Sequence, residues 1–257
     1  MSTSPAAFEG AAHGGARSRA VSRFYLGLAA VLFVVVLLGF SRTLYFRAFF
    51  DVRPIGFWVW IHGIGLTTWF VGIVLQTTLV AVQRTDVHRR LGWALAALAV
   101  VVVGTSAWIT MGTVPAMVAT GFDATTVAAL GPRVAWGNYA SAFTFAVLVG
   151  AAVSLRRHTQ AHKRLMLLAS ISIISPALAR VLQWPVFGAV VNDNFVVAAI
   201  VGSFVLAGIV AAHDLATQKR LHPATLVGVA LLVGAKLAAV IAIAPSAFGR
   251  ALVPGLP

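Results

Sequence analysis

Hydrophobic residues gather in seven long stretches of this chain, and ionisable residues are nearly absent inside them. A helix needs roughly 20 mostly apolar residues to cross about 30 Å of hydrocarbon. The pattern therefore predicts an all-α, polytopic membrane protein with seven transmembrane helices. The predicted spans are Phe24–Phe40, Ile55–Val80, Leu91–Met111, Trp136–Leu155, Leu165–Leu182, Phe195–Ala212 and Ala224–Ile243.

Outside these stretches the chain holds mostly short connections and one tail. The longest connection, Gly112–Ala135, is predicted to be a loop with a short helix at Asp123–Leu130, and Pro176 is expected to kink the fifth helix. Residues 1–21 are rich in Ala, Gly and Ser, a composition typical of a disordered tail. Residues 22–257 are predicted to form a single transmembrane domain. Arginines precede the first apolar stretch as in a signal peptide, but no small-residue cleavage site follows that stretch. The first helix is therefore expected to be retained.

The net charge of +13 is best explained by orientation in a membrane. When the N-terminus is placed in the cytoplasm, 12 of the 19 Lys and Arg residues fall on the cytoplasmic side, as the positive-inside rule requires. We expect an inner (plasma) membrane protein with its C-terminus outside. Membrane lipid is the expected partner, and the charge does not indicate nucleic-acid binding. Because cysteine is absent, disulfides, thiolate metal sites and cysteine nucleophiles are excluded.

Two similar motifs indicate a weak internal repeat. His88-Arg89-Arg90-Leu91 and His162-Lys163-Arg164-Leu165 lie 74 residues apart, and each opens a predicted span after a short basic loop. Helices 2–3 and 4–5 are thus predicted to form parallel hairpins. The repeat also predicts that His88 and His162 lie at equal depth on the cytoplasmic side.

The second predicted helix carries a polar stripe. His62, Trp69 and Gln76 follow one another at seven-residue spacing, so they lie on nearly one helix face. Such a face should point into the bundle rather than toward lipid. It is either a ladder of hydrogen bonds that fixes packing or the wall of a cavity.

A second group of polar residues is expected in the same, outer leaflet as His62. Arg180 and Gln183 end the fifth predicted helix, and Asn138 lies near the start of the fourth. Together they could line a pocket for a carboxylate, a phosphate or a quinone carbonyl, because guanidinium groups match planar oxyanions. The alternative is that Arg180 extends to the interface and binds nothing.

Lys236 lies near the centre of the seventh predicted helix, where a charge costs about 2.5–3.5 kcal/mol. A lysine in the last of seven helices is also a feature of retinal proteins. Retinal is not expected, because a Schiff base needs a carboxylate counter-ion and no predicted span contains Asp or Glu. Lys236 is instead expected to bind backbone carbonyls or to belong to the cationic pocket.

Histidines on the predicted cytoplasmic side form another candidate site. Two imidazoles facing each other at one depth could be the axial ligands of haem b, with His88, His162 and His213 as the candidates. The alternative is that these are ordinary interfacial residues. A zinc site is less expected, because three or four ligands would have to converge without cysteine.

Several motifs resemble those of a group of uncharacterised bacterial multi-pass membrane proteins. They are His62 with Trp69 and Gln76, His88-Arg89-Arg90-Leu91-Gly92, His162-Lys163-Arg164-Leu165-Met166, Ala179-Arg180 and His222-Pro223. This resemblance implies a shared fold but no activity. The helix starts that pair histidine with basic residues are more faintly similar to membrane cytochromes b and haem-handling oxidase-assembly proteins, a similarity that implies haem b as the cofactor.

Two functions therefore follow as hypotheses. The first is a protein without catalytic residues that binds a small lipophilic or anionic ligand in an outer-leaflet cavity. Its expected lining residues are His62, Trp69, Gln76, Asn138, Arg180, Gln183 and Lys236. The second is a redox protein that binds haem b through His88, His162 and His213.

Overall fold

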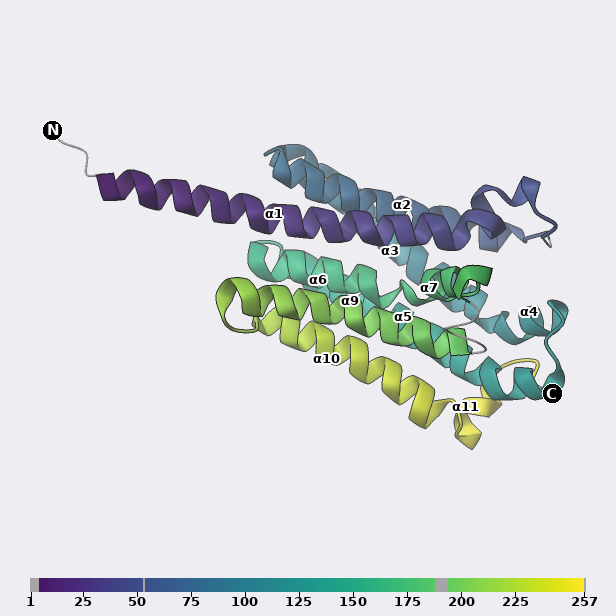
Figure 1. Ribbon diagram of the computed structural model, residues 1–257. Coiled ribbons are helices and arrows are strands. Elements are labelled where there is room, and N and C mark those ends of the chain that lie inside the picture. The colour runs from purple at the N-terminus through teal and green to yellow at the C-terminus, as the bar shows by residue number, and fades with distance from the viewer. Residues whose placement is uncertain (1–4, 53, 188–193, 257) are drawn as a thin grey trace.

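The computed structural model describes residues 5–52, 54–187 and 194–256, and every regular element in these ranges is a helix. The long helices run side by side in an elongated bundle (Figure 1). They are α1 (Pro5–Phe40), α2 (Phe57–Ala81), α3 (Thr85–Met111), α5 (Ala124–Ser154), α6 (Thr159–Ser172), α7 (Ser175–Leu182), α9 (Phe195–Gln218) and α10 (Pro223–Leu237). The shorter elements are η1 (Ser41–Tyr45), η2 (Arg47–Phe49), α4 (Thr113–Ala119), η4 (Ala238–Ile243) and α11 (Ala247–Ala251).

The predicted fold class is confirmed. In the described part of the chain, six helical segments are long and apolar enough to cross a membrane, and α6 with α7 gives a seventh if the bent pair is one span. These seven segments correspond one to one with the seven predicted spans. Helix α1 also includes residues 5–21, where a disordered tail is predicted, and that prediction remains open.

The fifth span is broken at Pro176. Helix α6 ends at Ser172, α7 begins at Ser175, and the two helices differ in direction by 45°. Proline has no N–H to donate to the carbonyl four residues earlier, and its ring clashes with that carbonyl. The kink expected at this proline is therefore confirmed.

The fourth span starts earlier than predicted. Helix α5 begins at Ala124, not near Trp136, so the predicted long loop Gly112–Ala135 is wrong. Asp123 caps the helix, because its carboxylate accepts a hydrogen bond from the Thr126 amide at 2.9 Å. The short helix predicted at Asp123–Leu130 is thus the first part of α5.

Pro132 lies inside this extension without ending it. Its ring cannot donate to the Ala128 carbonyl in the preceding turn. Arg250 of α11 donates to that carbonyl instead, at 3.3 Å. The sequence pattern could not predict this compensation, because Arg250 follows Ala128 by more than a hundred residues.

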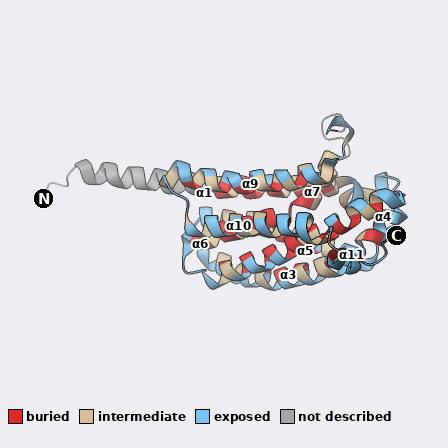
Figure 2. Cartoon of the chain, turned by 90° about the horizontal axis from the view of Figure 1, so that it is seen from below, coloured by how far each residue is buried: buried red, intermediate tan, exposed pale blue. Residues whose placement is uncertain are grey.

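Helix α5 occupies the centre of the bundle, where it contacts α3, α6 and α10. Helix α1 covers α2, α6 and α7, and α9 packs against α7 and α10. Buried residues lie mainly on the faces that the helices turn toward one another, while exposed residues lie on the outer faces (Figure 2). Many of these exposed residues are large and apolar, as expected of surfaces that face lipid.

Glycine permits a close contact between α1 and α7. A Cβ atom on Gly39 of α1 would clash with the backbone of Ala177 in α7. Helices in lipid associate through such close packing, since no hydrophobic force drives them together.

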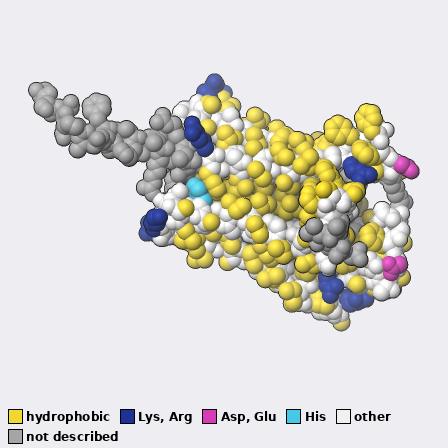
Figure 3. Space-filling model, viewed as in Figure 1, with side chains coloured by type: hydrophobic (Ala, Val, Ile, Leu, Met, Phe, Trp, Pro, Cys, Tyr) yellow, Lys and Arg dark blue, Asp and Glu magenta, His cyan; other side chains and the backbone are white. Residues whose placement is uncertain are grey.

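The connections between the helices lie at two ends of the bundle. At one end, called the basic end below, the connections α2–α3, α5–α6 and α9–α10 lie together (Figure 1). Lys and Arg side chains lie near both ends of the visible face, and hydrophobic side chains dominate between them (Figure 3). The sequence predicts that the basic end is cytoplasmic, and this orientation remains a prediction. Its basic residues are Arg84, Arg89, Arg90, Arg156, Arg157, Lys163, Lys219 and Arg220.

The internal repeat is visible at the basic end. His88 and His162 are each the fourth residue of their helix, α3 and α6. Each helix forms a hairpin with the one before it, α2 in the first case and α5 in the second. The repeat therefore brings two imidazoles to one level of the bundle.

Candidate functional site

A cavity of about 1140 Å³ opens at the basic end. Residues of α1, α2, α3, α5, α6 and α9 line it, so nearly every span contributes to its wall. Its apolar lining includes Trp69, Ile73, Leu95, Val149 and Leu167, and its polar lining includes three histidines. Ligand pockets commonly measure about 300–1,000 Å³, so the cavity is large enough for a sizeable small molecule.

Four buried polar atoms of the lining residues have no hydrogen-bond partner among the residues that the structure describes. They are Tyr25 Oη, Gln76 Oε1, His88 Nδ1 and His213 Nδ1. An unpaired buried polar group costs roughly 1–3 kcal/mol, and native proteins contain few of them. Their concentration around one cavity makes it the strongest candidate site in the described chain.

His88 and His162 lie next to each other in this wall. Their ring centres are 6.3 Å apart and their planes make an angle of 85°. His162 Nδ1 lies 2.8 Å from the Ala152 carbonyl oxygen. Because a carbonyl only accepts, Nδ1 carries the proton, and Nε2 is the nitrogen left for another partner. The predicted equal depth of the two histidines is confirmed.

Gln76 fixes the start of α3 against α2. Its side-chain amide donates to the His88 carbonyl at 3.2 Å. This bond identifies Nε2 as the atom facing the carbonyl and leaves Oε1 as an unpaired acceptor. Gln76 thus lies beside His88 at the basic end, in the wall of the same cavity.

His213 occupies the α1 side of the cavity. Its ring stacks on Phe24, with ring centres 3.8 Å apart and planes within 14° of parallel. The ring of Tyr25 meets it edge-on at 5.8 Å, and Lys163 Nζ lies 4.8 Å from the centre of the Tyr25 ring. In the described structure His213 makes no ring contact with His88 or His162, so only two of the three predicted haem ligands come together.

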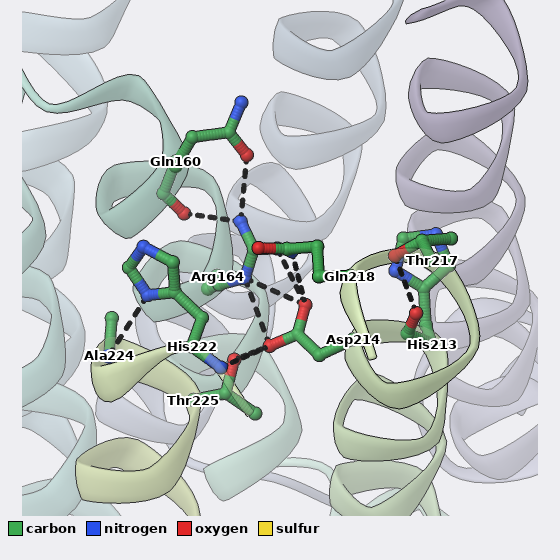
Figure 4. Close-up of polar contacts among 9 residues, drawn as sticks. All are labelled: Gln160, Arg164, His213, Asp214, Thr217, Gln218, His222, Ala224 and Thr225. Atoms are coloured by element: carbon green, nitrogen blue, oxygen red, sulfur yellow. Dashed lines mark hydrogen bonds and ion pairs between the residues drawn. The ribbon is translucent and has the colours of Figure 1, made fainter. Parts of the chain in front are cut away.

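A buried ion pair borders the cavity (Figure 4). Arg164 of α6 donates through Nε and Nη2 to the Asp214 carboxylate of α9, with a shortest distance of 2.5 Å. The exposed fractions are 1% for Arg164 and 0% for Asp214. Arg164 Nη1 also donates to the carbonyl and the side-chain oxygen of Gln160. The pair therefore holds the basic ends of α6 and α9 together.

The Asp214 carboxylate accepts further hydrogen bonds from α9, the α9–α10 connection and α10. The donors are Gln218 Nε2, the His222 amide and Thr225 Oγ1, at 3.2, 3.2 and 2.5 Å. A buried carboxylate is tolerated when its oxygens are satisfied in this way. This carboxylate is thus occupied by partners within the chain.

The predicted span ends at Ala212, and Asp214 follows it in the last turns of α9, which continues to Gln218; the structure shows that this carboxylate is buried. The sequence contains one indication of the partner of Asp214. Arg164 directly precedes the fifth predicted span, at the end of the bundle that has many basic residues and few acids.

His222 begins α10 as an N-cap. Its Nδ1 accepts a hydrogen bond from the Ala224 amide at 3.1 Å, as Figure 4 shows. Burial, and secondarily the charge of Arg164, lowers the pKa of His222 from its ordinary value of 6.5. The neutral ring can keep accepting this bond, whereas a protonated ring could not.

Four basic side chains of the cavity lining have no acidic partner among the described residues. They are Arg89, Arg156, Arg157 and Lys163. The lining residues include no Asp or Glu. The site therefore combines an apolar interior with positive charge that the described chain leaves unneutralised.

The predicted outer-cavity residues separate into two regions. Trp69 and Gln76 line the basic-end cavity, where Trp69 Nε1 donates to Ser170 Oγ at 3.1 Å. His62 and Arg180 do not line it. His62 Nδ1 lies 3.0 Å from Thr105 Oγ1, and Arg180 donates to the Pro176 carbonyl at 3.0 Å.

Lys236 is buried at the α5–α10 contact. Its ammonium donates to the Gly137 carbonyl at 2.8 Å and to Ser141 Oγ. The expected contact with a backbone carbonyl is therefore present, although the carbonyl belongs to α5. Asn138 is half-buried in α5, and Gln183 is exposed just after α7.

Three participants in this region were not identified as site residues from the sequence. Tyr25 lies in a run of apolar residues, and Lys163 and Arg164 resemble ordinary interfacial charges. Only the packing of α1 and α9 against α6 shows that their side chains meet.

Comparison with protein-family models, with curated proteins and with solved structures finds no match. The functional argument for this chain therefore depends on the geometry of its own residues.

Proposed function

We propose that this integral membrane protein binds an amphiphilic anion in the basic-end cavity. The observation that carries the proposal is the charge of the lining, which contains five basic residues and no acidic one. One of the five, Arg164, is neutralised by Asp214, and the other four form no ion pair with an acid in the described chain.

The two parts of the cavity suit the two parts of such a ligand. Arginine and lysine side chains bind carboxylates and phosphates, and arginine can do so through two parallel hydrogen bonds. The apolar lining, with Trp69 and Leu95 among its residues, suits a hydrophobic body. A ligand with one or two acidic groups on an apolar skeleton fits both requirements.

The outer-leaflet region around His62 and Arg180 is the less supported location for this ligand. His62 pairs with Thr105, and Arg180 bonds to the Pro176 carbonyl with its guanidinium over the Phe40 ring. These polar groups have partners inside the chain, whereas four polar atoms around the basic-end cavity have none among the residues that the structure describes.

A pair of probes tests the charge requirement. A fluorescent long-chain fatty acid and its uncharged methyl ester would be titrated into the protein in a non-ionic detergent. We expect the acid to bind more tightly than the ester, by tenfold or more, since about 1.4 kcal/mol corresponds to a factor of ten. The double variant Arg89→Ala and Arg157→Ala should lose this preference.

Arg220→Ala is the matched control. Arg220 lies at the same end of the bundle but does not line the cavity, so this variant should retain the preference for the acid. Equal binding of acid and ester to the wild-type chain would contradict the proposal. An equal loss in the Arg220 variant would show that the general surface charge is responsible.

A further inference from the structure

Within the proposed ligand site, the two adjacent imidazoles indicate a more specific occupant. Their ring centres lie 6.3 Å apart on two different helices. Metal–nitrogen bonds of about 2 Å place two opposite imidazole nitrogens about 4 Å apart and their ring centres about 6 Å apart. The observed separation matches this value, and helices in bundles commonly present such ligands inward.

The orientation of His162 also suits axial ligation. Histidine ligands typically donate their second ring N–H to a carbonyl or carboxylate, which fixes the ring and its tautomer. His162 donates Nδ1–H to the Ala152 carbonyl in this way, which leaves Nε2 as the nitrogen that can bind a metal in the neutral ring. An unprotonated Nε2 is the form that binds a metal.

The cavity that the two rings line has the chemistry of a porphyrin site. Its volume of about 1140 Å³ and its apolar lining can hold a large, flat, hydrophobic molecule. Haem b carries two carboxylates, and the unneutralised Arg89, Arg156 and Arg157 supply guanidinium groups for them. Because the chain has no cysteine, the macrocycle could not be attached through thioether bonds.

We propose that the amphiphilic anion is haem b, held by His88 and His162 as its two axial ligands. This inference rests on the proposed function, because the haem would occupy the same basic-end cavity. His213 lies on the α1 side, stacked on Phe24, and is not a ligand.

Gln76 is proposed as a positioning residue for His88. Its Oε1 and His88 Nδ1 are both buried and unpaired in the described structure, and a bond already joins the two residues through the His88 carbonyl. A small rotation of either side chain could pair the two atoms. The resulting acceptor for Nδ1–H would orient His88 as Ala152 orients His162.

Absorption spectroscopy tests the proposal directly. The full chain would be expressed with added haem precursor, purified in detergent and, in parallel, titrated with haemin. We expect one haem per chain, with a low-spin Soret band and resolved α and β bands after dithionite reduction. The absence of any low-spin spectrum in both preparations would overturn the haem assignment.

Three histidine variants locate the ligands. His88→Ala and His162→Ala should each lose the low-spin spectrum, and added imidazole should restore it. His158→Ala, in the exposed connection before α6 and outside the cavity lining, should keep the wild-type spectrum. If all three variants behave alike, the proposed pair is wrong; if a variant does not fold, His88→Met and His162→Met replace it, and a shifted α band is then expected.

Gln76→Leu should shift the reduction midpoint or the α band without loss of haem, since a residue that only packs would alter neither. The fatty-acid titration distinguishes failure of the haem assignment from failure of the proposed anion binding. If the acid binds through Arg89 and Arg157 but haem does not bind, only the haem assignment fails. If neither ligand depends on those arginines, the proposed function fails as well.

Discussion

Two neighbouring polar regions at the basic end differ in how their hydrogen bonds are satisfied. Around Asp214, charged and polar groups from α6, α9 and α10 are joined by hydrogen bonds within the chain. Around the cavity, Tyr25, Gln76, His88 and His213 each keep one buried polar atom without a partner in the described structure. The hydrogen bonds of the first region hold helices together, whereas the unpaired atoms of the second region are available to a ligand.

The largest expected change in unfolding free energy is in the hydrogen-bonded region around Asp214. Arg164→Met leaves the buried Asp214 charge without its cation, which should cost about 3–5 kcal/mol of unfolding free energy. Adding Asp214→Leu should recover part of this loss, because no unpaired charge then remains, although Thr225 and Gln218 lose their acceptor. Unfolding in detergent measures all three chains.

Arg89→Met is the control for that series. Arg89 is exposed and has no acidic partner in the described chain, so its replacement should change the unfolding free energy by no more than about 0.5 kcal/mol. A loss below about 1 kcal/mol for Arg164→Met would show that the ion pair does not hold the helices together.

A smaller change in unfolding free energy, of the opposite sign, is expected around the cavity, where polar atoms lack partners in the described structure. Tyr25→Phe removes a buried hydroxyl that has no partner among the described residues, so the unfolding free energy should stay equal or rise by up to about 1 kcal/mol. Tyr45→Phe is the matched control, because its hydroxyl lies 2.8 Å from Thr67 Oγ1. This control should lose about 0.5–1.5 kcal/mol. A loss in Tyr25→Phe as large as in the control would mean that Tyr25 Oη has a partner inside the chain.

The smallest expected effect is a dependence of stability on pH that arises from His222, at the start of α10. The pKa of His222 is lowered in the folded chain, so the unfolded chain binds a proton at higher pH. The stability that the neutral ring contributes is therefore present above the ordinary value of 6.5 and is lost as the pH falls through it. His222→Asn retains a capping side chain and does not titrate. Thermal unfolding at pH 7.5 and 5.5 should show a steeper loss for the wild-type chain, and equal slopes would contradict this role.

The sequence predicts the helices well because the apolar residues alone decide where a chain can cross lipid. It predicts the kink at Pro176 for a similarly local reason, the missing N–H. That α5 continues through Pro132 escaped prediction; Arg250, from a distant part of the chain, donates to the Ala128 carbonyl that Pro132 cannot reach. Helix boundaries that depend on such contacts cannot be read from local patterns.

The candidate site is predictable only in part. The motif repeat correctly places His88 and His162 side by side, because equal positions in parallel hairpins lie at equal depth. The polar stripe on α2 is divided: His62 pairs with Thr105, while Trp69 and Gln76 line the basic-end cavity. The pattern on a helix face predicts that its residues point into the bundle, but not which other helices surround them. The location of the cavity therefore could not be predicted from α2 alone.

The claim that a ligand binds in the basic-end cavity is tested most directly by a variant with a larger side chain in the cavity wall, in which stabilisation by the ligand is measured. Gly92 lines the cavity, and the nearest atom to a Cβ there would be Gln76 Nε2, at 3.5 Å, so Gly92→Leu should occupy part of the cavity and obstruct a ligand. Gly104 lies on the same helix, is exposed and has no atom near its Cβ position, which makes Gly104→Leu the matched control. Thermal unfolding would be followed with a long-chain fatty acid or haemin at 100 times its dissociation constant.

A ligand at that concentration should stabilise the wild-type chain and the Gly104 variant by about 2.7 kcal/mol. The Gly92 variant should show little or no stabilisation. If the Gly92 variant is stabilised as strongly as the control, the ligand binds elsewhere and the basic-end cavity is not the functional site.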